Sequence, residues 1–130
     1  MSPRFDCIGL VAADLPATLA FYRQLGLDIP AEADQAPHVE VALPGGLRLL
    51  WDPVSTILSF DPTFDAETGL GGSALGFACD DAADVDRVHQ AVVAAGHASH
   101  LAPFDAPWGQ RYATVVDPDG NHVDLFAPLG

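Results

Sequence analysis

The chain has 130 residues, of which 49% are hydrophobic and 18% charged, with a formal net charge of −13. These values suit one compact domain with its own core and exclude a disordered chain. An acidic surface repels nucleic-acid phosphates and anionic lipids, so neither nucleic acid nor a membrane is expected as a partner. The sequence opens without the long apolar run of a signal peptide, and we expect a cytoplasmic protein.

Taken in chain order, the first half follows a strand–helix–strand pattern. Residues 5–12 alternate as a strand, and Asp14 then caps a predicted helix over residues 15–25. Two strands are expected over residues 38–43 and 47–52, on either side of a Pro-Gly-Gly turn. These elements make up a first module at about residues 4–52.

The second half repeats this order after a connector at residues 53–72, in which a short helical turn is expected near Ser55 to Phe60. A strand over residues 73–79 and a helix from Asp80 or Asp81 to about Ala95 precede strands near residues 97–101, 110–116 and 122–126. Residues 117–121, Asp-Pro-Asp-Gly-Asn, favour a tight turn between the last two strands. We therefore predict one domain over residues 1–130, with a second module at about 73–128.

The repeat predicts an α+β fold of two βαβββ modules that form a curved mixed sheet around a groove. One helix can cover only one face of its sheet, so the other face stays open until a homodimer closes it. Whether modules are exchanged between the two chains stays open at this point. Alternation turns Ile8 and Leu10 toward the helix, and Cys7 toward the groove. Small side chains at residues 74, 76 and 78 then give the groove a flat floor.

Two segments carry a family resemblance. Residues 7–27, from Cys-Ile-Gly-Leu to Gln-Leu-Gly-Leu, resemble the opening of a vicinal oxygen chelate module. Residues 117–126, Asp-Pro-Asp-Gly-Asn-His-Val-Asp-Leu-Phe, resemble the closing hairpin of the second module. This superfamily includes glyoxalase I, extradiol dioxygenases, fosfomycin-modifying enzymes and bleomycin-binding resistance proteins. The resemblance extends over nearly the whole chain.

The resemblance also implies where a metal would be held. Enzymes of the superfamily bind a divalent metal with four side chains, and the corresponding positions here are Cys7, Leu49, Ala74 and Asp124. Leucine and alanine have no donor atom, and a lone Cys and Asp make a poor site for Mg²⁺, Mn²⁺ or Zn²⁺. We therefore predict no metal, no cofactor and no catalytic residue.

Residues 29–38, 45–52 and 108–113 are similar to segments of the mitomycin-binding resistance proteins. In that subgroup a planar antibiotic is held between aromatic rings without chemistry. The resemblance implies that His38 and Trp108 are the two ring positions. Trp108 follows Pro107 at a loop-to-strand junction, where an indole can stack on a ligand or pack against the other module or a partner chain.

Four further residues are candidates for the pocket wall. Trp51 shares a strand face with Leu49. We assign Trp51 to the groove side of the sheet or to a dimer interface. Tyr112 and Phe104 are aromatic candidates of the same kind. Asp124 could accept a hydrogen bond from a ligand amine or bond the backbone of its own hairpin.

The leading hypothesis is non-catalytic sequestration of a planar aromatic molecule, such as a mitomycin-like or bleomycin-like antibiotic, which confers resistance. A metal-independent isomerase or quinone-reducing partner protein is a second hypothesis, with Cys7, Asp124 or His38 as acid–base groups. A third is a glyoxalase-like lyase or dioxygenase-type enzyme with an atypical metal shell.

Overall fold

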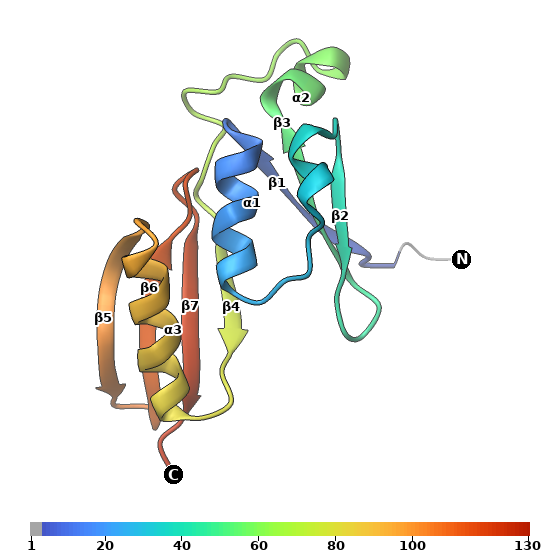
Figure 1. The fold of residues 1–130 in the computed structure, drawn as a ribbon. Helices are drawn as coiled ribbons and strands as arrows, with labels where there is room; N and C mark the ends of the chain where they lie inside the picture. Colours follow the sequence, from blue (N-terminus) through green and yellow to red (C-terminus); the bar gives the residue numbers. More distant parts are fainter. Residues whose placement is uncertain (1–3) are drawn as a thin grey trace.

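The computed structural model describes residues 4–130, and it is an α+β fold as predicted (Figure 1). In chain order the elements are β1 (Cys7–Ala12), α1 (Leu15–Gln24), η1 (Ala31–Gln35), β2 (Val39–Ala42), β3 (Arg48–Pro53), α2 (Val54–Phe60), β4 (Ala74–Ala78), α3 (Ala82–Ala94), β5 (Ala98–Ala106), β6 (Gln110–Val116) and β7 (His122–Pro128). Within this part of the chain, no helix has the length and apolar character needed to span a bilayer.

The first module is a three-stranded sheet covered by α1. Its strand order is β1-β3-β2, with β1 parallel and β2 antiparallel to β3. The predicted cap is present, because the Asp14 side chain accepts a hydrogen bond from the backbone N–H of Ala17 at 3.2 Å. α1 buries Leu15, Leu19 and Tyr22 at helical spacing, which fixes the face that it turns toward the sheet.

The two strands expected after α1, at residues 38–43 and 47–52, are present as β2 and β3, which is one strand fewer than a full βαβββ unit has. The chain between α1 and β2 forms η1, a 3₁₀ helix, between Pro30 and Pro37. Proline has no N–H to donate to a sheet, which disfavours strand pairing here. The Arg23 side chain also donates to the carbonyls of Ile29 and Pro30, at 2.8 Å each, and so holds the segment against α1.

The second module is a complete βαβββ unit. Its four-stranded sheet has the order β4-β7-β6-β5, with β4 parallel to β7 and the other pairs antiparallel. Asp81 caps α3 by accepting from the backbone N–H of Asp84 at 2.8 Å. β5 is longer than predicted and extends to Ala106, with register shifts between Ser99 and Phe104.

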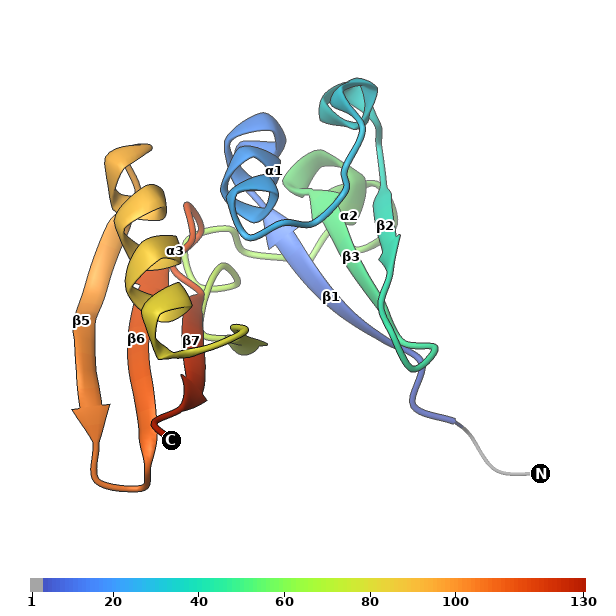
Figure 2. The same ribbon diagram turned by 60° about the horizontal axis from the view of Figure 1, so that its bottom comes forward.

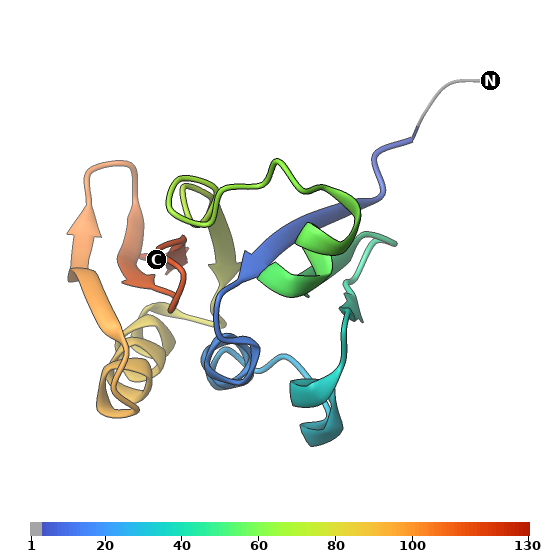
Figure 3. The same cartoon turned by 90° about the horizontal axis from the view of Figure 1, so that it is seen from above.

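The two modules share one hydrophobic core. α1 and α3 lie side by side on the same side of the two sheets (Figures 1 and 3). The core cluster joins Leu19, Tyr22 and Trp51 of the first module to Val92 and Val115 of the second. The two sheets splay apart below the helices (Figure 2), and the described strands form no hydrogen-bonded ladder between them.

The β6–β7 turn, predicted from its Asp-Pro-Asp-Gly-Asn sequence, also connects the two modules through hydrogen bonds. The Tyr22 hydroxyl of α1 donates to the buried Asp117 carboxylate at 2.7 Å. Thr18 donates to Asp119 at 2.6 Å, and the Ala13 N–H donates to the same side chain at 2.9 Å. Burial and the Asp117 charge raise the pKa of Tyr22, so its hydroxyl stays a donor. The turn therefore connects module 2 to the start of α1.

The parallel strand pair at the centre of each module has the same register. Cys7, Gly9 and Val11 of β1 lie opposite Arg48, Leu50 and Asp52 of β3. Ala74, Gly76 and Ala78 of β4 lie opposite His122, Asp124 and Phe126 of β7. The two sets correspond position by position, which confirms the internal repeat and defines the equivalent residues of the two modules.

Candidate functional site

Each sheet has one face packed on its helix and one face that no helix covers. In module 2 the buried residues Ala113, Val115, Val123 and Leu125 point toward α3. Alternation places Tyr112, Thr114, Asp124 and Phe126 on the other face. We call this surface, together with Phe104 of β5 and Trp108 of the β5–β6 turn, the aromatic face.

Three aromatic rings gather at one end of the aromatic face. Trp108 lies edge-on to Phe104 and Tyr112, with ring centroids 6.4 and 5.3 Å away, and Phe104 and Tyr112 are 6.0 Å apart. Trp108 is 59% exposed, and its indole N–H donates to Gln110 at 2.8 Å. The hydrogen bond fixes the indole while its ring stays accessible. The structure thus brings together three of the aromatic residues that the sequence singled out.

Phe126 is a residue of this face that sequence reasoning missed. Its ring lies over Gly76 of β4, where a Cβ atom would be 3.2 Å from the ring edge. Only glycine at this position leaves the ring its full space. The signal was present in the sequence, because Phe126 is two residues after Asp124 and must share its face.

Polar groups line the middle of the aromatic face. The buried Thr114 hydroxyl donates to the Asp124 carboxylate at 2.8 Å. Hydrogen bonding to Asp124, with burial as a lesser cause, raises the pKa of Tyr112 to about 12. Asp124 therefore bonds side chains of β6 rather than the backbone of its own hairpin. Beyond it, the His100 and His122 rings lie 4.5 Å apart, a pair that the sequence analysis did not identify.

The corresponding face of module 1 carries charges. Arg48 bridges two carboxylates, donating to Asp6 at 2.6 Å and to Glu40 at 2.6 Å. His38 is bound at both ring nitrogens, by Asp52 at 2.5 Å through Nδ1 and by Glu40 at 2.7 Å through Nε2. We call these five side chains the ionic face. Hydrogen bonds that His38 donates to Asp52 and Glu40 raise its pKa above the usual range, which favours the imidazolium.

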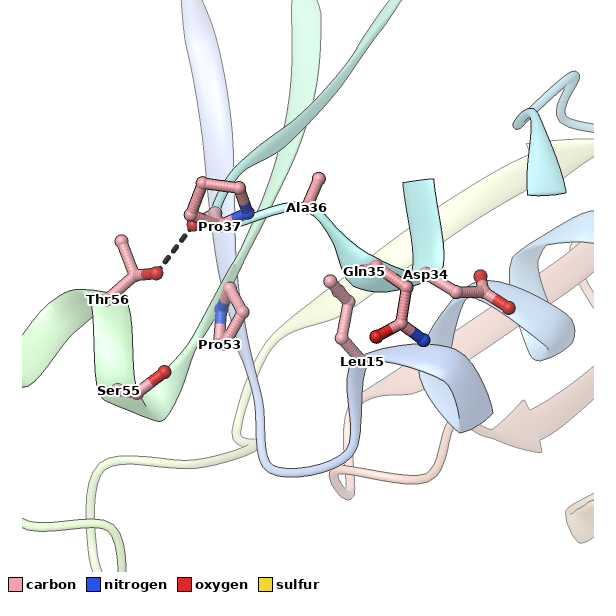
Figure 4. A pocket seen from close by; sticks show the side chains of 8 residues that line it. All are labelled: Leu15, Asp34, Gln35, Ala36, Pro37, Pro53, Ser55 and Thr56. Atoms are coloured by element: carbon pink, nitrogen blue, oxygen red, sulfur yellow. Dashed lines mark hydrogen bonds between the residues drawn. The ribbon is translucent and has the colours of Figure 1, made fainter. Parts of the chain in front are cut away.

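The strand entrance before His38 is fixed by α2. The Thr56 hydroxyl donates to the Pro37 carbonyl at 2.6 Å, across a hollow of about 380 Å³ (Figure 4). Leu15, Asp34, Gln35, Ala36, Pro53 and Ser55 complete its lining. None of the seven residues predicted for the site lines this hollow.

The prediction for Trp51 is wrong. Trp51 is fully buried, and its ring lies 5.2 Å from that of Tyr22, so it belongs to the core. The parallel register pairs Trp51 with Leu10 and Leu49 with Ile8, and all four point toward α1. The open-face position is therefore Leu50, between the charged Arg48 and Asp52.

The four positions where the superfamily's enzymes bind metal do not fit a cation here. Cys7 and Ala74 begin their strands at equivalent positions, and Leu50 is the equivalent of Asp124. The correction from Leu49 to Leu50 leaves the donor set unchanged, because leucine and alanine have no lone pair to offer. Across residues 4–130, no group of three or more His, Cys, Asp or Glu side chains is arranged to hold a metal.

His38 and Trp108 lie far apart within one chain. His38 precedes β2, the outer strand of the first sheet, and Trp108 follows β5, the outer strand of the second. These two strands form opposite sides of the molecule (Figures 1 and 2). A single chain therefore does not form the ring sandwich that the resemblance implies.

Comparison with known protein families identifies the superfamily to which this fold belongs. The model of the Glyoxalase/Bleomycin resistance protein/Dioxygenase superfamily matches residues 4–125. The chain belongs to this superfamily. No curated protein matches it.

Solved structures of superfamily members share the fold. A glyoxalase-related enzyme from Fulvimarina pelagi has a TM-score of 0.77 at 22% identity, covering 95% of this chain and 86% of that one. A glyoxalase/bleomycin resistance protein/dioxygenase family enzyme from Burkholderia phytofirmans PsJN has a TM-score of 0.74 at 20% identity, covering 98% and 100%. A lactoylglutathione lyase from Agrobacterium tumefaciens has a TM-score of 0.66 at 25% identity, covering 97% and 94%.

Proposed function

We propose that this superfamily member binds and sequesters a planar aromatic small molecule without transforming it. The observation that carries the proposal is the exposed ring of Trp108, held by Gln110 and flanked by Phe104 and Tyr112 on an uncovered sheet face. An exposed apolar patch with polar groups beside it is typical of a binding surface. Each ring stacked on a ligand contributes about 0.5–1.5 kcal/mol beyond surface burial.

The proposal includes a mitomycin-like or bleomycin-like antibiotic as the ligand and drug resistance as its consequence in the cytoplasm. This part of the proposal rests on the resemblance of residues 29–38, 45–52 and 108–113 to segments of mitomycin-binding resistance proteins. Residues at three of the aromatic positions, Phe104, Trp108 and Tyr112, lie together on the aromatic face. Asp124 is placed to accept a hydrogen bond from a ligand amine, since its carboxylate lies on the aromatic face beside Thr114 and Tyr112.

A homodimer is part of this proposal. His38 and Trp108 lie at opposite edges of one chain, so a sandwich needs the ionic face of one copy against the aromatic face of another. A two-fold axis would generate two such sites per dimer, because each copy brings one face of each kind. Analytical ultracentrifugation should give twice the chain mass. A monomer that binds the ligand with full affinity would contradict this part of the proposal.

The test of the function uses mitomycin C as the probe in isothermal titration calorimetry with EDTA present. We expect saturable binding by the wild type, and unchanged drug recovered by mass spectrometry after prolonged incubation. Trp108→Ala should weaken binding at least about tenfold, since it removes one of the aromatic rings that stack on the ligand. Phe60→Ala is the matched control, because Phe60 is 69% exposed at the end of α2 and belongs to neither the aromatic face nor the ionic face. Binding that requires a divalent ion, or conversion of the drug, would refute the proposal.

An enzyme using the same faces is the competing function, favoured by the structural similarity to a lactoylglutathione lyase. Its acid–base groups would be Cys7, His38 or Asp124. Both nitrogens of His38 already bind carboxylates, and one oxygen of Asp124 accepts from Thr114. Product formation from hemithioacetals, lost in Asp124→Asn, would establish this alternative.

A further inference from the structure

A cavity of about 540 Å³ lies between the two sheets, where they splay apart. It is larger than the hollow beside α2 and is separate from it. Its ten lining residues are Ile8, Leu27, Leu43, Pro44, Leu49 and the five residues of β4. We call this cavity the inter-module cleft. Its volume is within the range of about 300–1,000 Å³ that is usual for small-molecule sites.

The lining of the inter-module cleft is mostly aliphatic and includes no ionisable side chain. Its large apolar side chains are half-buried, with the exception of the buried Leu49. They pack against the core cluster, so the cleft is an opening in the core. A charge placed there would lose its hydration without gaining a partner, which is costly. The cleft therefore favours an uncharged, apolar ligand, in contrast to the acidic surface of the chain.

β4 presents its edge to the inter-module cleft. All five of its residues line the cleft, although their side chains alternate between the two faces of the sheet. This edge is unpaired, because β7 is the only described strand that pairs with β4. β4 also contains no charged residue and no proline, so nothing in its sequence blocks a hydrogen-bonding partner.

The register of β4 identifies which backbone groups are free. The Cys79 N–H, directly after β4, donates to the Phe126 carbonyl of β7 at 2.8 Å. In a parallel ladder alternate residues bond the same neighbouring strand. The N–H and C=O groups directed toward the cleft are therefore those of Ala74, Gly76 and Ala78. Their small side chains leave these groups accessible, and all three residues are exposed.

We propose that the inter-module cleft binds an uncharged aliphatic molecule that carries an amide group. The aliphatic part fills the apolar cavity, and the amide pairs with the free edge of β4, because an amide donates and accepts as a neighbouring strand does. This site is distinct from the aromatic face. Leu75 and Phe77 pack toward the helices, whereas Phe126 lies on the opposite side of the second sheet.

The first arm of the test determines the ligand class by calorimetry with three aliphatic probes, none of which can stack on an aromatic ring. Octanamide should bind saturably. Hexanamide should bind about tenfold more weakly, because it buries two fewer methylene groups. Octanoate has the same chain length but carries a charge and has no donor, so it should bind at least about tenfold more weakly than octanamide.

The second arm locates the site in the wild-type protein and in one variant of the edge. In ¹H–¹⁵N correlation spectra octanamide should shift the amide signals of Gly76 and Ala78 most, since these N–H groups face the cleft. Ala78→Pro removes one free donor and none of the bonds to β7. It should weaken octanamide binding about fivefold.

A charge in the lining should have the larger effect. Leu43→Asp should weaken octanamide binding at least about tenfold, because the amide's aliphatic chain would then contact a carboxylate. Leu58→Asp is the matched control and should bind as the wild type does. Leu58 is 43% exposed on α2 and does not line the cleft.

Saturable octanamide binding with both probe preferences, and with the largest shifts at Gly76 and Ala78, supports the inference. Absence of saturable binding, equal affinity for octanamide and octanoate, or shifts centred outside β4 overturns it, whether or not the variants fold. Displacement of octanamide by mitomycin C also overturns it, because the two ligands would then share a site. Failure of mitomycin C to bind refutes only the proposed function, on which this inference does not rest.

Discussion

The open faces of the two modules have the same backbone register but opposite chemistry. Gly9 and Gly76 occupy equivalent places, yet Asp52 of the ionic face corresponds to Phe126 of the aromatic face. Leu50 likewise corresponds to Asp124. The repeat thus preserves the strand pairing and the helix packing, while the uncovered positions differ freely because no core depends on them. One face carries a network of charged side chains, and the other carries exposed aromatic rings.

The largest effect should come from breaking the connection between the modules at Asp117. Asp117→Ala removes the acceptor of Tyr22 and leaves buried donors of the β6–β7 turn unsatisfied. We expect the free energy of unfolding to fall by about 5 kcal/mol, since three buried donors lose their acceptor and each buried unsatisfied group costs about 1–3 kcal/mol. Urea denaturation followed by circular dichroism measures it.

Asp65→Ala is the control for this variant, because Asp65 is an exposed connector residue whose side chain bonds only the nearby Glu67 N–H. Its unfolding free energy should stay within about 0.5 kcal/mol of the wild type. Equal stability of the Asp117 and Asp65 variants would show that the turn does not hold the modules together.

The next effect sharpens the contrast between the two tryptophans. Trp51→Ala should lower the free energy of unfolding by about 3–5 kcal/mol in a well-packed core, or by less where the core relaxes. Trp51→Phe should be tolerated, because the buried indole N–H has no hydrogen-bond partner among the described residues and its loss removes an unsatisfied group. Trp108→Phe should leave stability unchanged, since its ring is exposed. Thermal and urea unfolding of the three variants measures these differences. If Trp108→Phe were the least stable variant, the assignment of Trp51 to the core and Trp108 to the surface would be wrong.

A smaller effect separates the equivalent glycines. In Gly76→Ala the new Cβ would lie 3.2 Å from the Phe126 ring, whereas a Cβ at Gly9 meets nothing within 4 Å. We expect Gly76→Ala to be less stable than Gly9→Ala by about 1 kcal/mol, through displacement of the ring. Chemical denaturation of both variants decides this. Equal stabilities would mean that Phe126 does not lie over Gly76.

The smallest effect is a pH dependence at the ionic face. The pKa of His38 is raised in the folded state, so its contribution to stability is fully present below the ordinary histidine pKa of about 6.5. This contribution is lost as the pH rises through the raised pKa. The stability difference between the wild type and Asp52→Asn should therefore shrink with rising pH above neutrality. A difference that grows over this range would contradict the imidazolium.

Much of the fold was predictable from the sequence, because helix capping and the alternation of apolar residues in strands are local signals. Asp14 and Asp81 cap their helices, and the last two strands lie close to the predicted ranges. The first module lacks the third strand of a βαβββ unit, because residues 31–35 form η1, and Arg23 of α1 holds the chain just before it through the carbonyls of Ile29 and Pro30.

The site was partly predictable for the same reason. Phe104, Trp108 and Tyr112 gather as a cluster because β5 and β6 form a hairpin. Trp51 was placed on the wrong face, because apolar residues at 49, 50 and 51 give no alternation of their own. The charged neighbours Arg48 and Asp52 carry the correct signal, since charges point away from the core. The contacts of His38 with Asp52 and Glu40 depend on pairing between β2 and β3, which no local pattern reveals.

The most direct test of the central claim uses Trp51→Phe, in which Trp108 is the sole tryptophan. Titration with mitomycin C in EDTA should quench its fluorescence saturably, because the ligand stacks on the exposed indole. If the quenching is absent or only linear in drug concentration, while Trp51 in the Trp108→Phe variant is quenched saturably, the aromatic face is not the binding site.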